Sequence, residues 1–175
     1  MADSTTASPS GARARSNVTL YVRDGDAFHE APARQVLLQA QELIDQQFHR
    51  QCPVLSNPQL VRVFLKIHLG RHDREVFAAL FLDSHHRLIE YVELFQGTID
   101  TSEVHPREVI KEALLRNAAA VILAHNHPSG IAQPSKADQR ITRQLKEALD
   151  LVGVKVIDHI IVGESIQSFV ELGLL

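Results

Sequence analysis

Residues 118–153, AAAVILAHNHPSGIAQPSKADQRITRQLKEALDLVG, decide the fold because they predict a buried strand, a tight loop and an amphipathic helix in succession. The first ten residues are an apolar run that ends at two histidines, which is typical of a strand covered on both faces. Two prolines and a glycine then turn the chain back. From Ser135 onward apolar residues recur at helical spacing, and Gly153 is expected to end the helix.

The flanking segments extend this pattern into an α/β domain, a mixed sheet flanked by helices. The polar turn DSHHR predicts a hairpin between two of the strands, and Ser56 or Asn57 is expected to cap the helix that Pro58 begins and Gly70 ends. The predicted strands are 17–25, 75–83, 88–97, 154–163 and 168–172, and the predicted helices are 31–48, 56–70 and 105–117.

Length and composition indicate one main domain with a short N-terminal extension. The 175 residues are 45% hydrophobic, enough for a substantial core, and residues 1–17 have the composition of a disordered tail. Residues 18–53 are expected to form a strand and helix extension, and 54–175 the main domain. Cys52 is the only cysteine, the start lacks a secretory signal, and no apolar run approaches the roughly 20 residues of a membrane span. The sequence therefore predicts a cytoplasmic protein without membrane contact.

The two histidines and an acid beyond the loop form a candidate metal site. Residues two apart on a strand point to the same face, so His125 and His127 project together, while Asn126 points away and is expected to brace the loop. If the loop folds back over the strand end, Asp138 supplies a carboxylate as third ligand. Three nitrogen or oxygen ligands with a fourth position open are the arrangement of a catalytic zinc site.

The same letters also have a purely structural interpretation. Ser135 and Asp138 form Ser-x-x-Asp, which is close to a helix capping box, and two histidines two residues apart are common at polar strand ends. The two interpretations are compatible if Ser135 helps to start the helix while Asp138 binds metal. The letters HNH do not indicate an HNH nuclease, because such sites spread their residues over a ββα unit.

The pattern H-x-H-x7-S-x-x-D, formed by the two histidines with Ser135 and Asp138, resembles the JAMM motif of the MPN/JAB metallopeptidases. Over roughly residues 54–175 the chain is similar to the RadC-like branch of that group, in a short form without the N-terminal helix-hairpin-helix region. Asp158 and His159 belong to this pattern, either as groups that support the site or as a buried Asp–His hydrogen bond. The matching segments are GTID (97–100), HPREVIKEAL (105–114), HNHPSG (125–130), PSKAD (134–138) and DHIIVG (158–163).

The resemblance implies the JAB/MPN (cytidine deaminase-like) fold and a role for each motif residue. The two histidines and Asp138 would be the zinc ligands, and Ser135 would hydrogen-bond the metal-bound water or the developing oxyanion. An upstream glutamate would be the general base, and Glu75, at the start of a predicted strand, matches that position best. Glu90 and Glu93 are weaker candidates, more simply interpreted as solvent-facing strand residues.

The activity that the resemblance implies is zinc-dependent hydrolysis of a peptide or isopeptide bond in an unnamed peptide or protein substrate. The alternative is a RadC-like accessory protein in DNA repair or mobile-element DNA transactions, with a metal that takes no part in catalysis. A net charge of -3 offers little to phosphates, so nucleic-acid binding is possible but not favoured. A zinc deaminase-like hydrolase is disfavoured because its Pro-Cys-x-x-Cys ligands are absent. Two histidines and a carboxylate suit zinc, although another divalent ion stays open.

Overall fold

The computed structural model describes residues 19–49, 57–97 and 104–175. The chain divides into two compact units, Met1–Val36 and Leu37–Leu175. The tail predicted for residues 1–17 and the candidate cap Ser56 lie outside the described residues. Within those residues, no helix combines the length and the apolar character that crossing a bilayer requires.

The first unit contains a β-hairpin, of which the sequence predicted only one strand. Strand β1 (Tyr21–Asp24) pairs in antiparallel fashion with β2 (Ala27–Glu30), and Gly25 in the turn between them has a φ of +58°. A positive φ is readily adopted by glycine, so the residue suits this two-residue turn. The helix predicted over 31–48 is observed as α1 (Ala33–His49), which begins in this unit and continues past the boundary at Val36.

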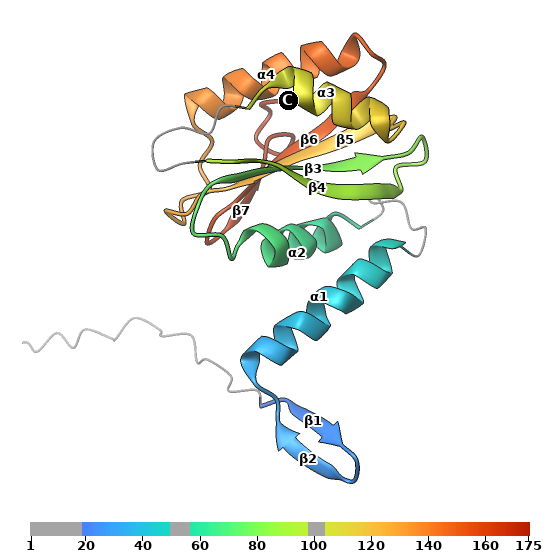
Figure 1. The fold of residues 1–175 in the computed structure, drawn as a ribbon. Helices are drawn as coiled ribbons and strands as arrows, with labels where there is room; N and C mark the ends of the chain where they lie inside the picture. The colour runs from blue at the N-terminus through green and yellow to red at the C-terminus, as the bar shows by residue number, and fades with distance from the viewer. Residues whose placement is uncertain (1–18, 50–56, 98–103) are drawn as a thin grey trace, which may run out of the picture. The chain divides into compact units, whose positions relative to one another are not determined.

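A five-stranded mixed sheet organises the second unit, in the order β4-β3-β5-β6-β7 (Figure 1). Strands β5 and β6 are parallel, whereas β3 runs antiparallel to both β4 and β5, and β7 runs antiparallel to β6. This arrangement confirms the predicted mixed α/β fold and the β3–β4 hairpin. The strands are β3 (Val76–Leu82), β4 (Leu88–Gln96), β5 (Ala120–Asn126), β6 (Lys155–Val162) and β7 (Ile166–Ser168).

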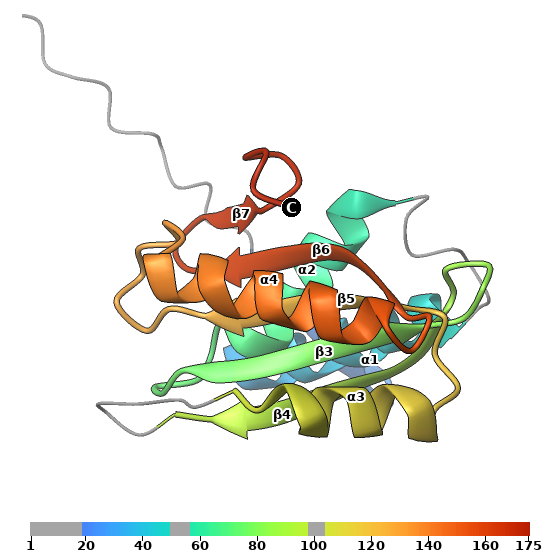
Figure 2. The ribbon, with the colours of Figure 1, turned by 90° about the horizontal axis from the view of Figure 1, so that it is seen from above.

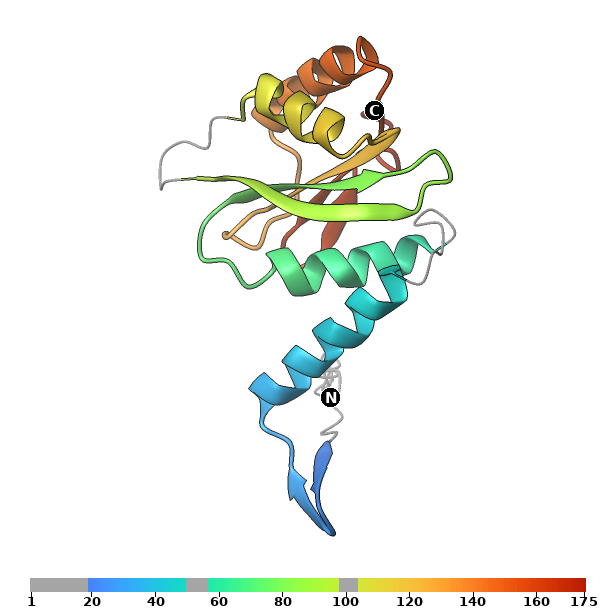
Figure 3. The same ribbon diagram turned by 45° about the vertical axis from the view of Figure 1, so that its right-hand side comes forward.

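Helices cover both faces of this sheet. Helix α2 (Pro58–Leu69) lies on one face, while α3 (Pro106–Leu115) and α4 (Lys136–Asp150) lie on the other, as Figures 2 and 3 show. Asn57 caps α2, since its Oδ1 accepts a hydrogen bond from the Leu60 N–H at 3.0 Å. The predicted choice between Ser56 and Asn57 is thereby settled in favour of Asn57 within the described residues.

The strands divide the core into two layers because successive side chains point to opposite faces. On β5, Ile122 and Ala124 pack toward α2, whereas Val121 and Leu123 pack toward α3 and α4. This alternation continues to the end of the strand. It places His125 on the α4 side of the sheet and Asn126 on the α2 side, so these two neighbours have different contacts.

The last predicted strand, SFVEL over 168–172, is wrong except for its first residue. Strand β7 ends at Ser168, where the Oγ accepts a hydrogen bond from the Glu171 N–H at 3.2 Å and the carbonyl accepts one from the Leu172 N–H at 3.1 Å. These bonds close a turn, and they take the place of sheet pairing. Phe169 is consequently turned into the core, where it is fully buried.

Candidate metal centre

The two histidines converge at the end of β5. His125 is 1% exposed, and its Nε2 lies 2.9 Å from the Nε2 of His127, which follows the last residue of the strand. The His127 N–H donates to the Val162 carbonyl at 2.9 Å, so the chain continues beside β6 for one residue past the strand. The His127 Nδ1 donates to the Ile131 carbonyl at 2.6 Å, so in the neutral ring the lone pair lies on Nε2.

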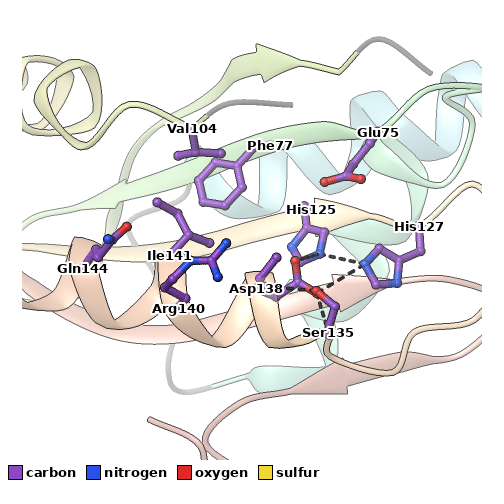
Figure 4. A pocket seen from close by; sticks show the side chains of 11 residues that line it. Glu75, Phe77, Val104, His125, His127, Ser135, Asp138, Arg140, Ile141 and Gln144 are labelled. Atoms are coloured by element: carbon purple, nitrogen blue, oxygen red, sulfur yellow. Dashed lines mark hydrogen bonds and ion pairs between the residues drawn. The ribbon is translucent and has the colours of Figure 1, made fainter. Parts of the chain in front are cut away.

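Asp138 approaches these imidazoles from the first turn of α4, and it also completes the capping box. Its Oδ2 accepts a hydrogen bond from the Ser135 N–H at 2.7 Å, and the Ser135 Oγ accepts one from the Asp138 N–H at 3.1 Å. Figure 4 shows the carboxylate held against both rings. Asp138 therefore belongs both to the capping box and to the group of three residues that could hold a metal ion.

The donor set, two imidazoles and a carboxylate, is of a type that zinc binds. The His125 Nε2 lies 3.4 Å from Asp138 Oδ1, and the His127 Nε2 lies 3.6 Å from Asp138 Oδ2. Ligands at about 2.0–2.1 Å from zinc lie roughly 3.3–3.4 Å apart at the corners of a tetrahedron. The distance of 2.9 Å between the two nitrogens is shorter, and His127, the more exposed of the two rings, has the freedom to adjust. These three residues could hold a metal ion.

The electrostatics prepare Asp138 and His125 to bind a cation at neutral pH. Burial alone would raise the pKa of Asp138, but the adjacent His127 and His125 and the hydrogen bonds from Ser135 together hold it well below its usual range. Burial lowers the pKa of His125 to about 4, against the opposing effect of Asp138. The carboxylate is therefore ionised and the His125 imidazole neutral, which are the protonation states that metal ligation requires.

The metal-free protein is expected to lose stability as the pH falls from about 6.5 toward 4. Burial lowers the pKa of both His125 and His159 in the folded state, so the unfolded chain binds more protons in this window. The shift of His125 from 6.5 to about 4 corresponds to a loss on the order of 3 kcal/mol. Asp138 raises the pKa of His127, so the stability that His127 contributes is present below pH 6.5 and is lost only as the pH rises above that value.

Urea unfolding in EDTA at several pH values between 7 and 4.5 measures this dependence. A free energy of unfolding that stays constant over the window would contradict the assignment of two buried, neutral imidazoles.

Glu75 lies across the pocket from the ligands. A cavity of about 550 Å³ is lined by Glu75, the two histidines, Ser135 and Asp138. Figure 4 shows the Glu75 side chain descending from the start of β3 toward the imidazoles. Asp138 and the Ile131 carbonyl raise the pKa of His127 against the opposing effect of burial, and the negative charge of Glu75 raises it further.

The other two candidate glutamates lie outside this cavity. Glu90 is exposed, and its Oε2 accepts a hydrogen bond from the Arg116 Nε at 2.8 Å. Glu93 Oε1 lies 3.0 Å from the His72 Nε2 and also accepts a hydrogen bond from the Tyr91 hydroxyl at 3.2 Å. Neither residue lines the cavity that contains the metal ligands.

Asn126 faces away from the ligands and braces a loop, although a different one from the loop that follows it in sequence. Its Oδ1 accepts a hydrogen bond from the Val76 N–H at 2.7 Å, and its Nδ2 donates to the carbonyls of Arg74 at 2.9 Å and His72 at 3.3 Å. These three bonds enclose Glu75. The central residue of the His-Asn-His triplet therefore fixes the backbone from which Glu75 projects.

Replacing Asn126 by Ala is expected to lower the free energy of unfolding by about 2 to 4 kcal/mol, because it leaves the Val76 N–H and two carbonyls without their partner in a buried place. Asn57→Ala is the matched control. It removes one exposed capping bond and should cost about 1 kcal/mol. Urea titrations compare the two, and an equal cost for both would show that the Asn126 bonds are not needed to hold the loop.

The structure places Asp158 and His159, whose roles the sequence left open, and adds Thr142, which the sequence did not single out. The side chains of Asp158 and His159 do not bond to each other, because neighbours on a strand point to opposite faces. The His159 ring lies on the α4 side, where it contacts His125 and Thr142. Asp158 instead accepts hydrogen bonds from the Ser168 hydroxyl and from the backbone N–H groups of His159 and Val170. The alternation of side chains along β6 explains why Asp158 and His159 have different partners. The contact with Thr142 depends on how α4 packs on the sheet.

Comparisons with known proteins agree with this architecture. The model of the RadC-like JAB domain matches residues 55–174. A UPF0758 protein of Leptothrix cholodnii is 60% identical over 126 residues, which cover 71% of this chain and 57% of the relative. One from Cellvibrio japonicus is 61% identical over 123 residues, covering 70% and 55%, and one from Vibrio cholerae is 51% identical over 140 residues, covering 80% and 88%.

The chain thus spans little more than half the length of the first two of these relatives. The family match covers more than two thirds of the chain and includes every residue of the candidate metal centre. It confirms the resemblance drawn from the motif. The chain belongs to the RadC-like JAB domain family.

Proposed function

We propose that this protein is a zinc-dependent hydrolase of peptide or isopeptide bonds. One observation carries the proposal: three possible ligands, a glutamate and a serine hydroxyl all line a single cavity. His125, His127 and Asp138 would hold the ion and leave its fourth position open to the cavity. A zinc ion bound there would supply a water of lowered pKa and a Lewis acid for the substrate carbonyl.

Glu75 would move the proton in this reaction. Its carboxylate would accept a proton from the attacking water and pass it to the nitrogen of the leaving amine, so that the amine departs neutral. The bonds that Asn126 makes on both sides of Glu75 support this role, because a general base must be held within hydrogen-bond reach of the water.

Ser135 would stabilise the charge that develops on the carbonyl oxygen. Its Oγ already accepts the capping bond from the Asp138 N–H, and its hydroxyl also hydrogen-bonds the Asp138 carboxylate. The same hydroxyl lines the cavity, where the carbonyl oxygen of a substrate would compete with that carboxylate for its hydrogen. A donor fixed by a helix cap needs little reorganisation during the reaction, which is the property that makes such groups effective.

The remaining cavity wall supports a polypeptide substrate. Phe77, Val104 and Ile141 provide apolar surface, and Arg140 and Gln144 of α4 project polar groups beside it (Figure 4). A mixed wall of this kind suits side chains and peptide groups of an extended chain.

The alternative, an accessory role in DNA transactions, is supported by one observation. Lys136, Arg140, Arg143 and Lys146 are exposed along α4, and among the described residues none of them forms an ion pair. A phosphate backbone bound there would be released steeply by salt. Binding of duplex DNA, measured at 50 and 200 mM salt, separates this role from hydrolysis.

Hydrolysis is tested with a panel of fluorogenic peptide and isopeptide substrates. Turnover should disappear on dialysis against a chelator and return when zinc is added. His127→Ala, prepared in the same way, is the control for contaminating peptidases and should show no turnover under any condition. Turnover that persists in the chelated protein or in this variant would contradict the proposal.

A further inference from the structure

A line of hydrogen bonds leads from the metal centre into the core. The His159 ring, which is completely buried, lies between His125 and Thr142. Its Nε2 is 2.8 Å from the His125 Nδ1, and its Nδ1 is 2.6 Å from the Thr142 Oγ1. The Thr142 hydroxyl in turn donates to the backbone carbonyl of Asp138 at 2.5 Å. The line thus begins at one proposed ligand and ends on the backbone of another.

The Asp138 carbonyl, at the end of this series of hydrogen bonds, determines which atom donates in each of them. A carbonyl oxygen can only accept, so the single hydroxyl hydrogen of Thr142 points to Asp138. The Thr142 oxygen must then accept from His159, which places the His159 hydrogen on Nδ1. Among the described residues no carboxylate contacts this buried ring, so it is neutral and its Nε2 carries a lone pair. The hydrogen of the remaining bond therefore belongs to the His125 Nδ1.

We propose that Thr142 and His159 are positioning residues that hold His125 in the tautomer with hydrogen on Nδ1 and a lone pair on Nε2. The Nε2 is the atom directed at the His127 Nε2 and at the Asp138 carboxylate. The inference rests on the metal centre of the proposed function, and it does not depend on which bond is cleaved or on whether any bond is cleaved.

Without these hydrogen bonds, His125 would favour the tautomer with its hydrogen on Nε2. The Asp138 Oδ1 lies 3.4 Å from its Nε2 and would attract a hydrogen to that atom, which would block the lone pair. His127 avoids this outcome by donating its Nδ1 hydrogen directly to the Ile131 carbonyl. His125 lies within β5 between two paired strands, where backbone carbonyls are engaged in the sheet, so a buried side chain has to accept its hydrogen.

Aromatic packing fixes the plane of the intermediate ring. Phe169 stacks on His159 with 4.7 Å between the ring centres, and Phe77 meets it edge-on at 5.5 Å. The turn that ends β7 is what brings Phe169 to this place. Both ring nitrogens of His159 are thereby held in line with their partners, which is the arrangement that an outer hydrogen-bonding partner of a metal ligand requires.

Nitrogen-15 NMR of histidine-labelled, metal-free protein at pH 7.5 reads the tautomers directly, with signals assigned against His125→Gln and His159→Gln. We expect both His125 and His159 to carry hydrogen on Nδ1. Hydrogen on the Nε2 of either ring would overturn the proposal. This reading uses wild-type protein and needs neither zinc nor a substrate.

Zinc affinity, measured by competition with a chromophoric chelator, is the second readout. Thr142→Val keeps the shape but removes the acceptor, and should weaken zinc binding about ten- to hundredfold, whereas Thr142→Ser should stay within about threefold of wild type. Asn57→Ala is the control: it also removes one side-chain hydrogen bond, the cap of α2 on the other face of the sheet, and should leave zinc affinity unchanged.

Equal zinc affinities for Thr142→Val and Asn57→Ala would overturn the proposal. If Thr142→Val does not fold, as judged by circular dichroism, the wild-type NMR spectrum decides. Expected tautomers and zinc affinities together with absent hydrolysis would refute the proposed enzyme activity and leave this inference intact. If the protein hydrolyses a substrate but His125 or His159 carries its hydrogen on Nε2, the proposed activity stands and this inference is refuted.

Discussion

Replacing Glu75 by Gln is expected to lower kcat of peptide or isopeptide hydrolysis by about 10² to 10⁴ while zinc content stays at the wild-type level. The amide has the shape of the carboxylate and still lines the cavity, but it cannot accept a proton from water. Because Glu75 is not one of the three ligand residues, the loss should fall on the chemical step and not on metal binding.

Glu93→Gln is the matched control, since Glu93 is also a half-buried glutamate of this sheet but pairs with His72 outside the cavity. It should retain wild-type kcat. Rates and zinc content are measured on the same preparations. Equal activity of Glu75→Gln and wild type would exclude Glu75 as the base, and loss of zinc from that variant would show that it holds the ion.

Replacing Asp138 by Ala is expected to weaken zinc binding at least about a hundredfold, more than loss of an outer hydrogen-bonding partner would. The same change deprives the Ser135 N–H of its acceptor, so the free energy of unfolding should fall by about 1 kcal/mol. Asp138→Asn separates the two roles. Its amide oxygen can still accept from Ser135, so stability should be largely kept, while the loss of charge should still weaken zinc binding.

Asp150→Asn, at the exposed end of the same helix, is the control for removing one negative charge from α4. Its zinc affinity should match the wild type. Calorimetric zinc titrations and urea unfolding give both quantities for each variant. If Asp138→Ala binds zinc as tightly as Asp150→Asn does, Asp138 is not a metal ligand and serves only as a helix cap.

Much of the fold could be predicted because local patterns agree with the tertiary structure. The apolar runs that became β3 and β5 are completely buried, and a strand covered by helices on both faces produces such a run. The candidate ligands His125 and His127 followed from a short-range rule, because alternate residues of a strand lie on the same face. Asp138 required two further inputs, a loop that folds back over the strand end and the resemblance to the JAMM motif.

What the sequence could not predict depends on register and on long-range packing. Asn126 bonds to a backbone segment 50 residues earlier, and His159 reaches His125 only because β6 pairs in parallel with β5 in one particular register. Thr142 would pass for an ordinary helix residue until α4 is laid on β6. Strand β2 and the turn after β7 were missed for a simpler reason: four-residue and three-residue strands give too short a pattern to recognise.

The central claim, that His125, His127 and Asp138 hold a zinc ion, is tested most directly by elemental analysis of untagged wild-type protein beside His127→Ala. His127 is the more exposed of the two histidine ligands, so its replacement disturbs the core least. We expect about one zinc per wild-type chain and none in the variant. Wild-type protein that contains no metal, even after zinc is supplied, would contradict it and leave Ser135 and Asp138 as a helix cap.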